Sequence, residues 1–333
     1  MKSIQKQCRE LNLGHALRQE VTHFTLFYRS AFFLAVCCGT LLLNGCTGPL
    51  MAGVFQVAGE SKFKDQDYEG ALVEFNKALG LDPGNSEIHH DLCSVRFQLS
   101  DFESALNDCN KAIQLSPQRS NFYVSRCAVY LGLAKFDLAS LDCSKAIEYN
   151  PQSHLAYNNL CAIKEKSGDF EAALGDCDAS IKMAPTPMAY RNRCAVKGGL
   201  NDLSGAIADC NEAIRLFPGF GPAHFVLAGI HELAGDKSAA LTHYDKAIEI
   251  DPKLQAAWLN RCALKYALDD QAGAIDDCKM SVEIDPKSDY AAISFRNLGI
   301  MHGEIDMGAA CDYLKEGASL GEDQADELFK DFC

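Results

Sequence analysis

Small and apolar residues recur along this chain with a period of about 34 residues. Seven prolines mark the period at intervals of 34, 34, 34, 33, 34 and 34 residues: Pro83, Pro117, Pro151, Pro185, Pro218, Pro252 and Pro286. When each proline is numbered position 32 of its unit, position 20 is alanine in all seven units, and position 27 is always alanine or serine. A fixed period of this size indicates stacked supersecondary units.

Each unit predicts two helices, the first at about positions 2–14 and the second at about positions 17–30. Asp occupies position 16 in six of the seven units, with Lys135 as the exception. An Asp at this point can cap the free N–H groups that open the second helix. The small residues at positions 20 and 27 let the two helices approach closely, and the proline ends the second helix. The predicted fold class is therefore all-α, built from helix–turn–helix repeats.

This pattern resembles the tetratricopeptide repeat (TPR) family. The segments "YNNL" at 157–160 and "WLNR" at 258–261 stand where the family has its first-helix signature. The resemblance covers residues 52–290 as seven repeats, and it implies a right-handed α-solenoid whose first helices line a concave groove. Residues 291–333 resemble a degenerate eighth TPR or Sel1-like repeat followed by a capping helix. That helix would carry its apolar residues on one face: Ala325, Leu328, Phe329 and Phe332.

Five of the seven repeats carry cysteines at both position 8 and position 24, and the other two carry neither. Each position lies about 12 Å from the turn at 1.5 Å per residue, so the two face each other on antiparallel helices. A disulfide needs Cα atoms about 5.5–6 Å apart, which closely packed helices allow. We predict these disulfides: Cys93–Cys109, Cys127–Cys143, Cys161–Cys177, Cys194–Cys210, Cys262–Cys278 and, from the remaining cysteines, Cys311–Cys333. The alternative is that the paired thiols are free and pack as small apolar groups.

The N-terminal region predicts a secretion signal. Residues 31–43 form an apolar run of 13 residues that follows Arg29. This run is short for a membrane-spanning helix, which needs about 20 residues, and suits a signal-peptide core. The sequence "LNGC" at 43–46 resembles the bacterial lipoprotein box. It implies a lipoprotein-type signal peptide at 1–45, a lipidated Cys46 and a short linker at 46–51. An uncleaved anchor and a misplaced start codon are the alternatives.

The cysteine count fits this interpretation. Of the 16 cysteines, Cys8, Cys37 and Cys38 would leave with the signal, and Cys46 would carry lipid. All the others belong to the six predicted pairs, and disulfides persist in oxidising compartments. We therefore expect a lipid-anchored protein of the bacterial cell envelope, on the outer membrane and facing the periplasm.

The net charge and the absence of catalytic motifs argue against nucleic-acid binding and against an enzymatic function. The chain has 31 basic and 45 acidic residues and a net charge of −14, and loss of the five basic and two acidic residues of 1–45 leaves −17. This acidity argues against nucleic acid as a partner. The sequence contains no P-loop, no nucleophile elbow, no dinucleotide fingerprint and no C-x-x-C zinc or redox motif. We expect no catalytic residue, no metal, no cofactor and no small-molecule substrate.

The resemblance implies where a partner would bind. In the TPR family, positions 2, 5, 9 and 12 of the first helices point into the groove, and the partner is expected at positions 5 and 9. The corresponding residues predicted here are His90, Ser94, Asn158, Arg191, Phe225, Leu259 and Arg296. Asn158 would hold a peptide amide, Arg191 and Arg296 would grip carboxylates, and Phe225 with Leu259 would form an apolar patch.

The predicted function is a non-catalytic scaffold or adaptor that binds a protein or peptide segment in this groove and reaches the membrane through its lipid. A self-assembling structural envelope protein is the alternative. An intracellular TPR adaptor with free thiols is another alternative, which applies if the signal is not used.

Replacement of Cys46 tests the anchor. Lipid anchoring needs more than one acyl chain, and these would be attached at Cys46. The Cys46→Ala variant should accumulate as full-length precursor or leave the membrane fraction, which immunoblots of fractionated cells would show. Processing and fractionation like those of the unaltered protein would exclude lipidation at Cys46.

Overall fold

The computed structural model describes residues 47–303 and 305–333, and the secondary structure of these residues is helical throughout. The chain divides into two compact units at Ile163 and Lys164, and each unit is described by itself. The predicted signal peptide and Cys46 lie outside the described residues. The predicted fold class, an all-α stack of helix–turn–helix repeats, is confirmed.

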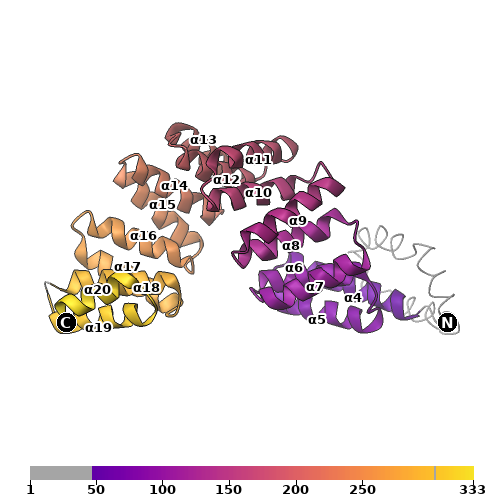
Figure 1. Ribbon diagram of the computed structural model, residues 1–333, viewed down its shortest axis with the longest axis horizontal. Coiled ribbons are helices and arrows are strands. Elements are labelled where there is room, and N and C mark those ends of the chain that lie inside the picture. Colours follow the sequence, from indigo (N-terminus) through magenta and orange to yellow (C-terminus); the bar gives the residue numbers. More distant parts are fainter. Residues whose placement is uncertain (1–46, 304) are drawn as a thin grey trace, which may run out of the picture. The chain divides into compact units, whose positions relative to one another are not determined.

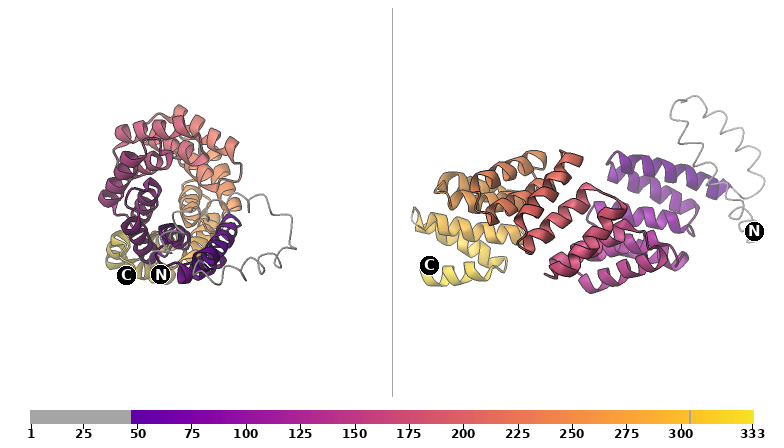
Figure 2. Two further views of the ribbon diagram at one scale, coloured as in Figure 1. Left: turned by 90° about the vertical axis from the view of Figure 1, so that its right-hand side faces the viewer. Right: turned by 90° about the horizontal axis from the view of Figure 1, so that it is seen from above.

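Unit 1 consists of successive antiparallel hairpins (Figures 1 and 2). Its helices are α4 (Thr47–Lys64), α5 (Tyr68–Leu81), α6 (Ser86–Gln98), α7 (Phe102–Leu115), α8 (Ser120–Gly132), α9 (Phe136–Tyr149) and the first part of α10 (His154–Lys166). The pairs α4/α5, α6/α7 and α8/α9 are the hairpins of the first three repeats.

Unit 2 continues the same arrangement. Its helices are the end of α10, α11 (Phe170–Met183), α12 (Pro187–Gly199), α13 (Leu203–Leu216), α14 (Gly221–Leu233), α15 (Lys237–Ile250), α16 (Gln255–Tyr266), α17 (Gln271–Ile284), α18 (Asp289–His302), α19 (Met307–Ser319) and α20 (Asp323–Phe332). The pairs α12/α13, α14/α15, α16/α17 and α18/α19 lie side by side as hairpins.

The turn inside each hairpin follows from local residue chemistry. The side chains of six aspartates at position 16 each accept a hydrogen bond from the backbone N–H three residues later: Asp67, Asp101, Asp169, Asp202, Asp236 and Asp270. Lys135 makes no such bond. Position 15 has a positive φ in all seven repeats, from 54° at Ala134 to 79° at Gly235. This left-handed residue closes the first helix and reverses the chain.

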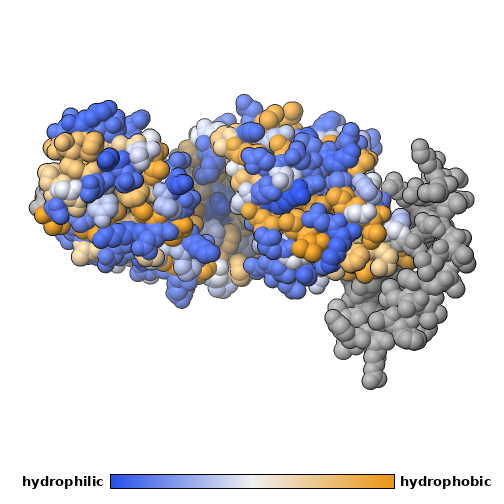
Figure 3. Space-filling model, turned by 90° about the horizontal axis from the view of Figure 1, so that it is seen from below, coloured by the Kyte–Doolittle hydropathy of each residue, from blue (hydrophilic) through white to orange (hydrophobic). Residues whose placement is uncertain are grey.

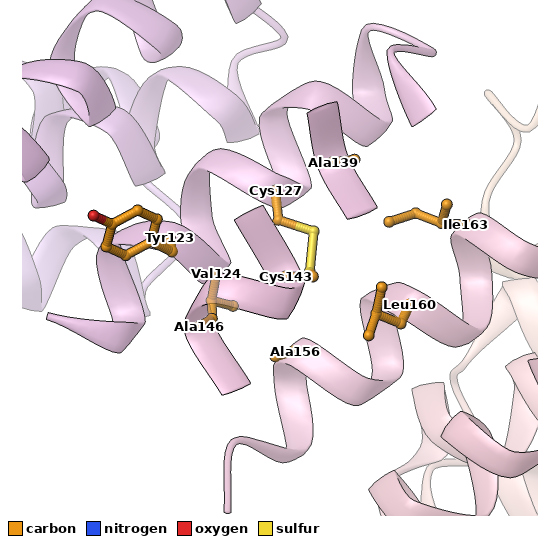
Figure 4. Packing of buried hydrophobic residues seen from close by; sticks show 9 residues of the cluster. All are labelled: Tyr123, Val124, Cys127, Ala139, Cys143, Ala146, Ala156, Leu160 and Ile163. Carbon is orange, nitrogen blue, oxygen red and sulfur yellow. A yellow bond between two sulfur atoms is a disulfide. The ribbon is translucent and has the colours of Figure 1, made fainter. Parts of the chain in front are cut away.

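The predicted close packing of the two helices is present in each described hairpin. The alanines at positions 20 and 27 are fully buried, for example Ala139 and Ala146 in the third repeat. Figure 4 shows these alanines and the Cys127–Cys143 disulfide inside one apolar cluster with Val124, Leu160 and Ile163. The cysteines are therefore part of the core.

The structure brings the predicted cysteines together within the hairpins. The Cα–Cα distance is 5.3 Å for Cys93–Cys109, 5.6 Å for Cys127–Cys143, 5.4 Å for Cys194–Cys210 and 5.5 Å for Cys262–Cys278. Cys311 and Cys333 also form a disulfide, with Cα atoms 5.8 Å apart. Cys161 and Cys177 are disulfide-bonded as well, but they lie in different units, so their predicted pairing stays a prediction.

The two repeats without cysteines fill the same space in another way. In the first repeat a Cβ added at Gly59 would lie 2.6 Å from Cε1 of Phe75, so the glycine makes room for the ring. In the sixth repeat Ala228 and Tyr244 are 0% and 1% exposed at these positions. A small residue with an aromatic, or two cysteines, therefore gives equivalent packing.

The N-terminal linker prediction is wrong for residues 47–51. Helix α4 begins at Thr47 and includes them. Gly48 lies close to the end of α5, because a Cβ added there would be 3.3 Å from the Leu81 carbonyl oxygen. Pro49 falls in the first turn of α4, where proline has no helical N–H bond to lose. The apolar residues that follow pack as the start of the first repeat.

The C-terminal helix α20 packs against α19 and α18 as a cap. Ala325 is fully buried beside Gly317, and Leu328 and Phe329 are half-buried. Phe332, which we expected on the same buried face, is 63% exposed. It lies in the last turn of α20.

The contribution of one disulfide can be measured in the fifth repeat. Replacing Cys194 and Cys210 together by Ala should lower the free energy of unfolding by about 3 kcal/mol or more. The reason is that the cross-link between residues 16 positions apart is lost and that the core loses volume. The matched control is Cys194→Gly with Cys210→Phe, which copies the packing of Gly59 and Phe75. It should recover the packing part of the loss in urea titrations.

Peptide mapping of protein alkylated without reduction gives the pairing itself. We expect the five described disulfides and Cys161–Cys177. Recovery of alkylated cysteines throughout would favour packed free thiols.

Candidate functional site

The candidate site is the surface formed by the first helices of the repeats at positions 5, 9 and 12. We call it the first-helix face and describe it separately in each unit. The predicted residues His90 and Ser94 lie on α6, Asn158 on α10, Arg191 on α12, Phe225 on α14, Leu259 on α16 and Arg296 on α18.

His90 is used within the fold of unit 1. Its Nε2 lies 2.9 Å from Oγ of Ser125, and its ring packs on Phe122 with a centroid distance of 4.9 Å. Burial lowers the pKa of His90 from 6.5 to about 4, so the ring is neutral at pH 7. Ser94 donates its hydroxyl to the His90 carbonyl at 3.0 Å. His90 therefore joins α6 to α8 through its Nε2.

Two of the predicted residues are buried. Asn158 is 5% exposed and already takes part in an interaction, and Leu259 is 6% exposed in a cluster with Cys262, Cys278 and Leu298. The prediction that Leu259 offers an exposed apolar patch is wrong, because the following repeat covers it. The prediction that Asn158 presents its amide to a partner is corrected for the same reason, its burial.

Arg296 is held by the C-terminal cap. Its Nη1 donates to Oε1 of Glu322 at 2.9 Å and to Oε1 of Gln324 at 2.6 Å. The prediction that Arg296 grips a partner's carboxylate is corrected, because Glu322 of this chain already supplies that carboxylate. The pairing fixes the start of α20 against α18.

Arg191 differs from the other cations of unit 2. Its Nε atom is buried and has no hydrogen-bond partner in the structure. Burial lowers the pKa of Arg191, and the charge of Glu165 opposes this effect. The guanidinium remains charged at pH 7, since arginine does not lose its proton in proteins. Nearby on α14, Phe225 packs partly against Tyr244, with ring centroids 6.0 Å apart.

Each unit has a small hollow on this face. In unit 1 it has a volume of about 210 Å³ and is lined by Phe63, Cys93, Ser94, Phe97, Gln98, Ser125 and Ala128. In unit 2 it has a volume of about 100 Å³ and is lined by Cys262, Ala263, Tyr266, Asn297, Ile300 and Met301. Both lie between the first helices of neighbouring repeats, where position 9 is small. Each is large enough for one side chain of a partner.

A row of buried aspartates was missed from the sequence. Asp stands directly before the second cysteine in each of the five cysteine repeats: Asp108, Asp142, Asp176, Asp209 and Asp277. Their side chains are between 4% and 15% exposed, and each is paired with a cation from position 7 or 11 of the first helix. The signal was available, because a basic residue occurs at position 7 or 11 of every one of these repeats.

The arginines at position 7 also join neighbouring repeats. Arg193 binds Asp209 through Nε at 2.8 Å and Nη2 at 2.7 Å, and its Nη1 binds Asp178 of the preceding repeat at 2.7 Å. These bonds raise the pKa of Arg193. Arg261 makes the same contacts with Asp277 and Asp245. The network is structural, since each ion pair joins groups of this chain.

Known proteins agree with this fold. A tetratricopeptide repeat family model matches residues 197–254. No curated protein matches the sequence significantly. The APC/C hetero-tetramer Cut9–Hcn1 is similar in structure, with 16% identity, a TM-score of 0.67 and coverage of 84% of this chain and 55% of that one. This chain therefore spans about half the length of that relative.

Two further solved structures are similar. A tetratricopeptide repeat protein of Parabacteroides merdae has 14% identity and a TM-score of 0.59, with 75% of this chain and 98% of that chain covered. The human IFIT1 dimer with PPP-AAAA has 16% identity and a TM-score of 0.64, with 81% and 73% covered. At these identities the likeness shows the fold alone. The family match shows a tetratricopeptide repeat within residues 197–254.

Two negative findings concern only residues 47–303 and 305–333. None of their helices is long and apolar enough to cross a membrane. No group of three or more His, Cys, Asp or Glu side chains among them could hold a metal ion.

Acidification should weaken unit 1 through His90. Because its folded pKa of about 4 lies below the unfolded value of 6.5, the unfolded state takes up a proton first as the pH falls. The contribution of His90 to the free energy of unfolding is present above pH 6.5 and is lost as the pH falls from 6.5 to 4. The loss from pH 7.5 to pH 5 should be about 2 kcal/mol from this residue.

The His90→Gln variant isolates this effect, since burial also lowers the pKa of His224 and of His243. Glutamine keeps a polar group near Ser125 but cannot gain the charge. Urea titrations should show a smaller loss in the variant. An equal loss in both proteins would mean that His90 is not the group responsible.

Proposed function

We propose that this chain is a non-catalytic scaffold of the bacterial cell envelope that holds an extended segment of a protein partner on its first-helix face. The lipid on Cys46 would anchor it to the outer membrane, facing the periplasm. The observation that carries the binding proposal is the buried Nε of Arg191, which has no hydrogen-bond partner.

A buried N–H group without a partner is unfavourable, and a carboxylate of a partner can supply the missing hydrogen bond to Arg191. Arginine binds carboxylates through two parallel hydrogen bonds, which also fix the orientation of the bound group. In unit 2 the other arginines of the first helices are already paired, as Arg193, Arg261 and Arg296 are. The partner segment would therefore place an Asp, a Glu or a C-terminal carboxylate at Arg191.

The backbone near Arg191 leaves room for such a segment. Position 9 is Ala195 on α12 and Gly229 on α14, and a Cβ added at Gly229 would meet no atom within 4 Å. A partner's main chain can come close to these small residues. The hollow of unit 2 would take a single apolar side chain of the same segment. Elsewhere, on the face shown in Figure 3, apolar residues form patches among polar ones.

The chemistry of the cysteines supports the proposed location. The described cysteines form disulfides, and bonds of this kind are kept in oxidising compartments such as the periplasm. The apolar run at 31–43 and the "LNGC" sequence at 43–46 add the lipoprotein-type signal. Two of the similar structures are assemblies, a hetero-tetramer and a dimer, and this is a property of those proteins.

Site-specific photo-crosslinking in intact cells tests the binding face. A photoreactive amino acid at Ala195 or Gly229 should cross-link to the same envelope protein. The same group at Leu141, which is 67% exposed on the second helix α9, should not. Mass spectrometry then identifies the partner. Cross-links from Leu141 but not from Ala195 or Gly229 would place binding on the other face.

Purified partner then allows a quantitative test of Arg191. Changing Arg191 and Phe225 together to Ala should weaken binding at least tenfold, which is about 1.4 kcal/mol. Leu141→Ala is the control and should bind normally, and circular dichroism should be unchanged in both. Unaltered affinity of the double variant would show that Arg191 is not the recognition residue. Sedimentation of the protein alone separates this function from self-assembly.

A further inference from the structure

Three histidines meet inside the sixth repeat, which has Ala228 and Tyr244 where its neighbours have a disulfide. His224 and His231 belong to α14, two helical turns apart, and His243 belongs to α15. Nδ1 of His224 lies 3.2 Å from Nδ1 of His243, and the rings of His231 and His243 stack with centroids 5.4 Å apart. His224 is 7% exposed and the other two are half-buried. The three rings therefore form a largely buried contact between the two helices of this hairpin.

The second repeat shows a charged version of the same contact. There the corresponding residues are His89, Arg96 and Asp108. Nδ1 of His89 lies 3.1 Å from Oδ1 of Asp108, and Arg96 pairs with Oδ2 of Asp108 at 2.7 Å. A proton taken up by His89 would meet a carboxylate. In the sixth repeat imidazoles stand in place of both the cation and the carboxylate, so acid adds charge of one sign only.

The hydrogen bond between His224 and His243 tolerates one added proton but not two. His224 hydrogen-bonds to the backbone of Pro218, and because proline has no N–H, the imidazole is the donor. Since Nδ1 of His224 faces His243, the donor is Nε2, and Nδ1 accepts the N–H of His243. If both rings are protonated, both Nδ1 atoms carry hydrogen. The bond is then lost, and two positive charges face each other.

The carboxylates around this contact are engaged elsewhere. Helices α12, α13 and α16 pack against the α14/α15 hairpin, and neither α12 nor α16 has an acidic residue. The acidic residues of α13, α14 and α15 each bind another group of the chain: Asp209 with Arg193, Glu212 with Arg215, Glu232 with the Tyr244 hydroxyl, Asp245 with Arg261 and Glu249 with Lys246. In the flanking turns, Asp236 caps α15 and Asp251 accepts from the backbone of Lys253.

The remaining titratable groups of these helices do not compensate the added charge. They are Arg191, Arg193, Lys197 and Tyr190 on α12, Arg215 on α13, Lys237, Lys246 and Tyr244 on α15, and Arg261, Lys265 and Tyr266 on α16. All are cations or tyrosines. Protonated imidazoles would therefore find no free carboxylate among the described residues of the hairpin and the helices packed on it.

Acid favours the open hairpin because its histidines take up protons more readily than those of the closed one. Burial, together with the charges of His224 and His231, lowers the pKa of His243 from 6.5 to about 4. Burial also lowers the pKa of His224; the bond to Pro218 opposes this, and the charge of Lys246 adds to it. Since these pKa values lie below those in water, the stabilisation is present above pH 6.5 and is lost as the pH falls towards 4.

We propose that the three histidines make the α14/α15 hairpin an acid-sensitive joint, which loosens on mild acidification while the disulfide-linked hairpins on either side stay closed. The fifth and seventh repeats are held by Cys194–Cys210 and Cys262–Cys278, so the opening is confined to the sixth repeat. Phe225 of α14 packs on Tyr244 of α15 with ring centroids 6.0 Å apart. Separation of the two helices therefore also changes the first-helix face at Phe225.

Hydrogen exchange read by mass spectrometry tests this on the full chain with its disulfides intact. Amide exchange is compared at pH 7.5 and pH 5 after correction for the intrinsic effect of pH. The opening constant of the α14/α15 amides should rise at least tenfold at pH 5. The amides of α12/α13 and α16/α17 should change little, because disulfides hold these hairpins and they lack the histidine contact.

Two variants separate the histidine contact from a general effect of acid. His231→Arg with His243→Asp rebuilds the charged cluster of the second repeat, so it should fold and lose most of the rise. His243→Gln keeps a polar group beside His224 but cannot gain a charge, and it should show a smaller rise. His90→Gln is the control and should behave in this hairpin as the unaltered protein does. Circular dichroism at pH 7.5 checks the fold of each variant.

The proposal is overturned if the α14/α15 amides respond to acid no more than those of α12/α13. It is also overturned if the folded variants keep the full rise. Because the measurement needs no protein partner and no membrane, its outcome is independent of the proposed binding function.

Discussion

The close approach of the two helices within each hairpin is the constraint on which the rest of this structure depends. Fully buried alanines at positions 20 and 27 bring the helices together, and no larger side chain would fit there. At this separation the Cα atoms of positions 8 and 24 are 5.3–5.6 Å apart, which suits a disulfide. It also leaves space for only one large side chain, so an aromatic at position 24 requires a glycine or alanine at position 8.

The same packing explains the buried aspartates. Position 23 lies beside position 24 on the edge of the buried stripe of the second helix. The carboxylate of an aspartate at position 23 therefore faces the first helix. A buried carboxylate without a partner is strongly destabilising, whereas a paired and hydrogen-bonded one is tolerated. Positions 7 and 11 are one helical turn apart and both reach the carboxylate, which is why either can hold the cation. Where position 7 is arginine, the remaining N–H groups reach the preceding repeat, and the pair also orders neighbouring hairpins.

The sequence predicted the elements whose causes are local. Helix limits followed from the prolines and the capping aspartates, and the cysteine pairs followed from their distance to the turn. The site was harder, because it depends on contacts between repeats. Position 5 points towards the groove in an idealised repeat, yet the ring of His90 is taken up by Ser125 and Phe122, and Leu259 is covered by the next repeat. Arg296 is bound by residues of α20, a helix outside the repeat pattern.

The described disulfides within repeats 1–7 lie inside hairpins, and this determines which parts of the scaffold can adjust when a partner binds. A disulfide between positions 8 and 24 fixes the geometry inside a hairpin, so the hairpin loses little conformational freedom when a segment binds to it. Contacts between hairpins rest on side-chain packing and ion pairs, which adjust by small shifts. Any accommodation of a bound segment would therefore occur between repeats, where the two hollows and Arg191 lie. The sixth repeat has no such bond, and the packing of Ala228 and Tyr244 alone joins its two helices at these positions.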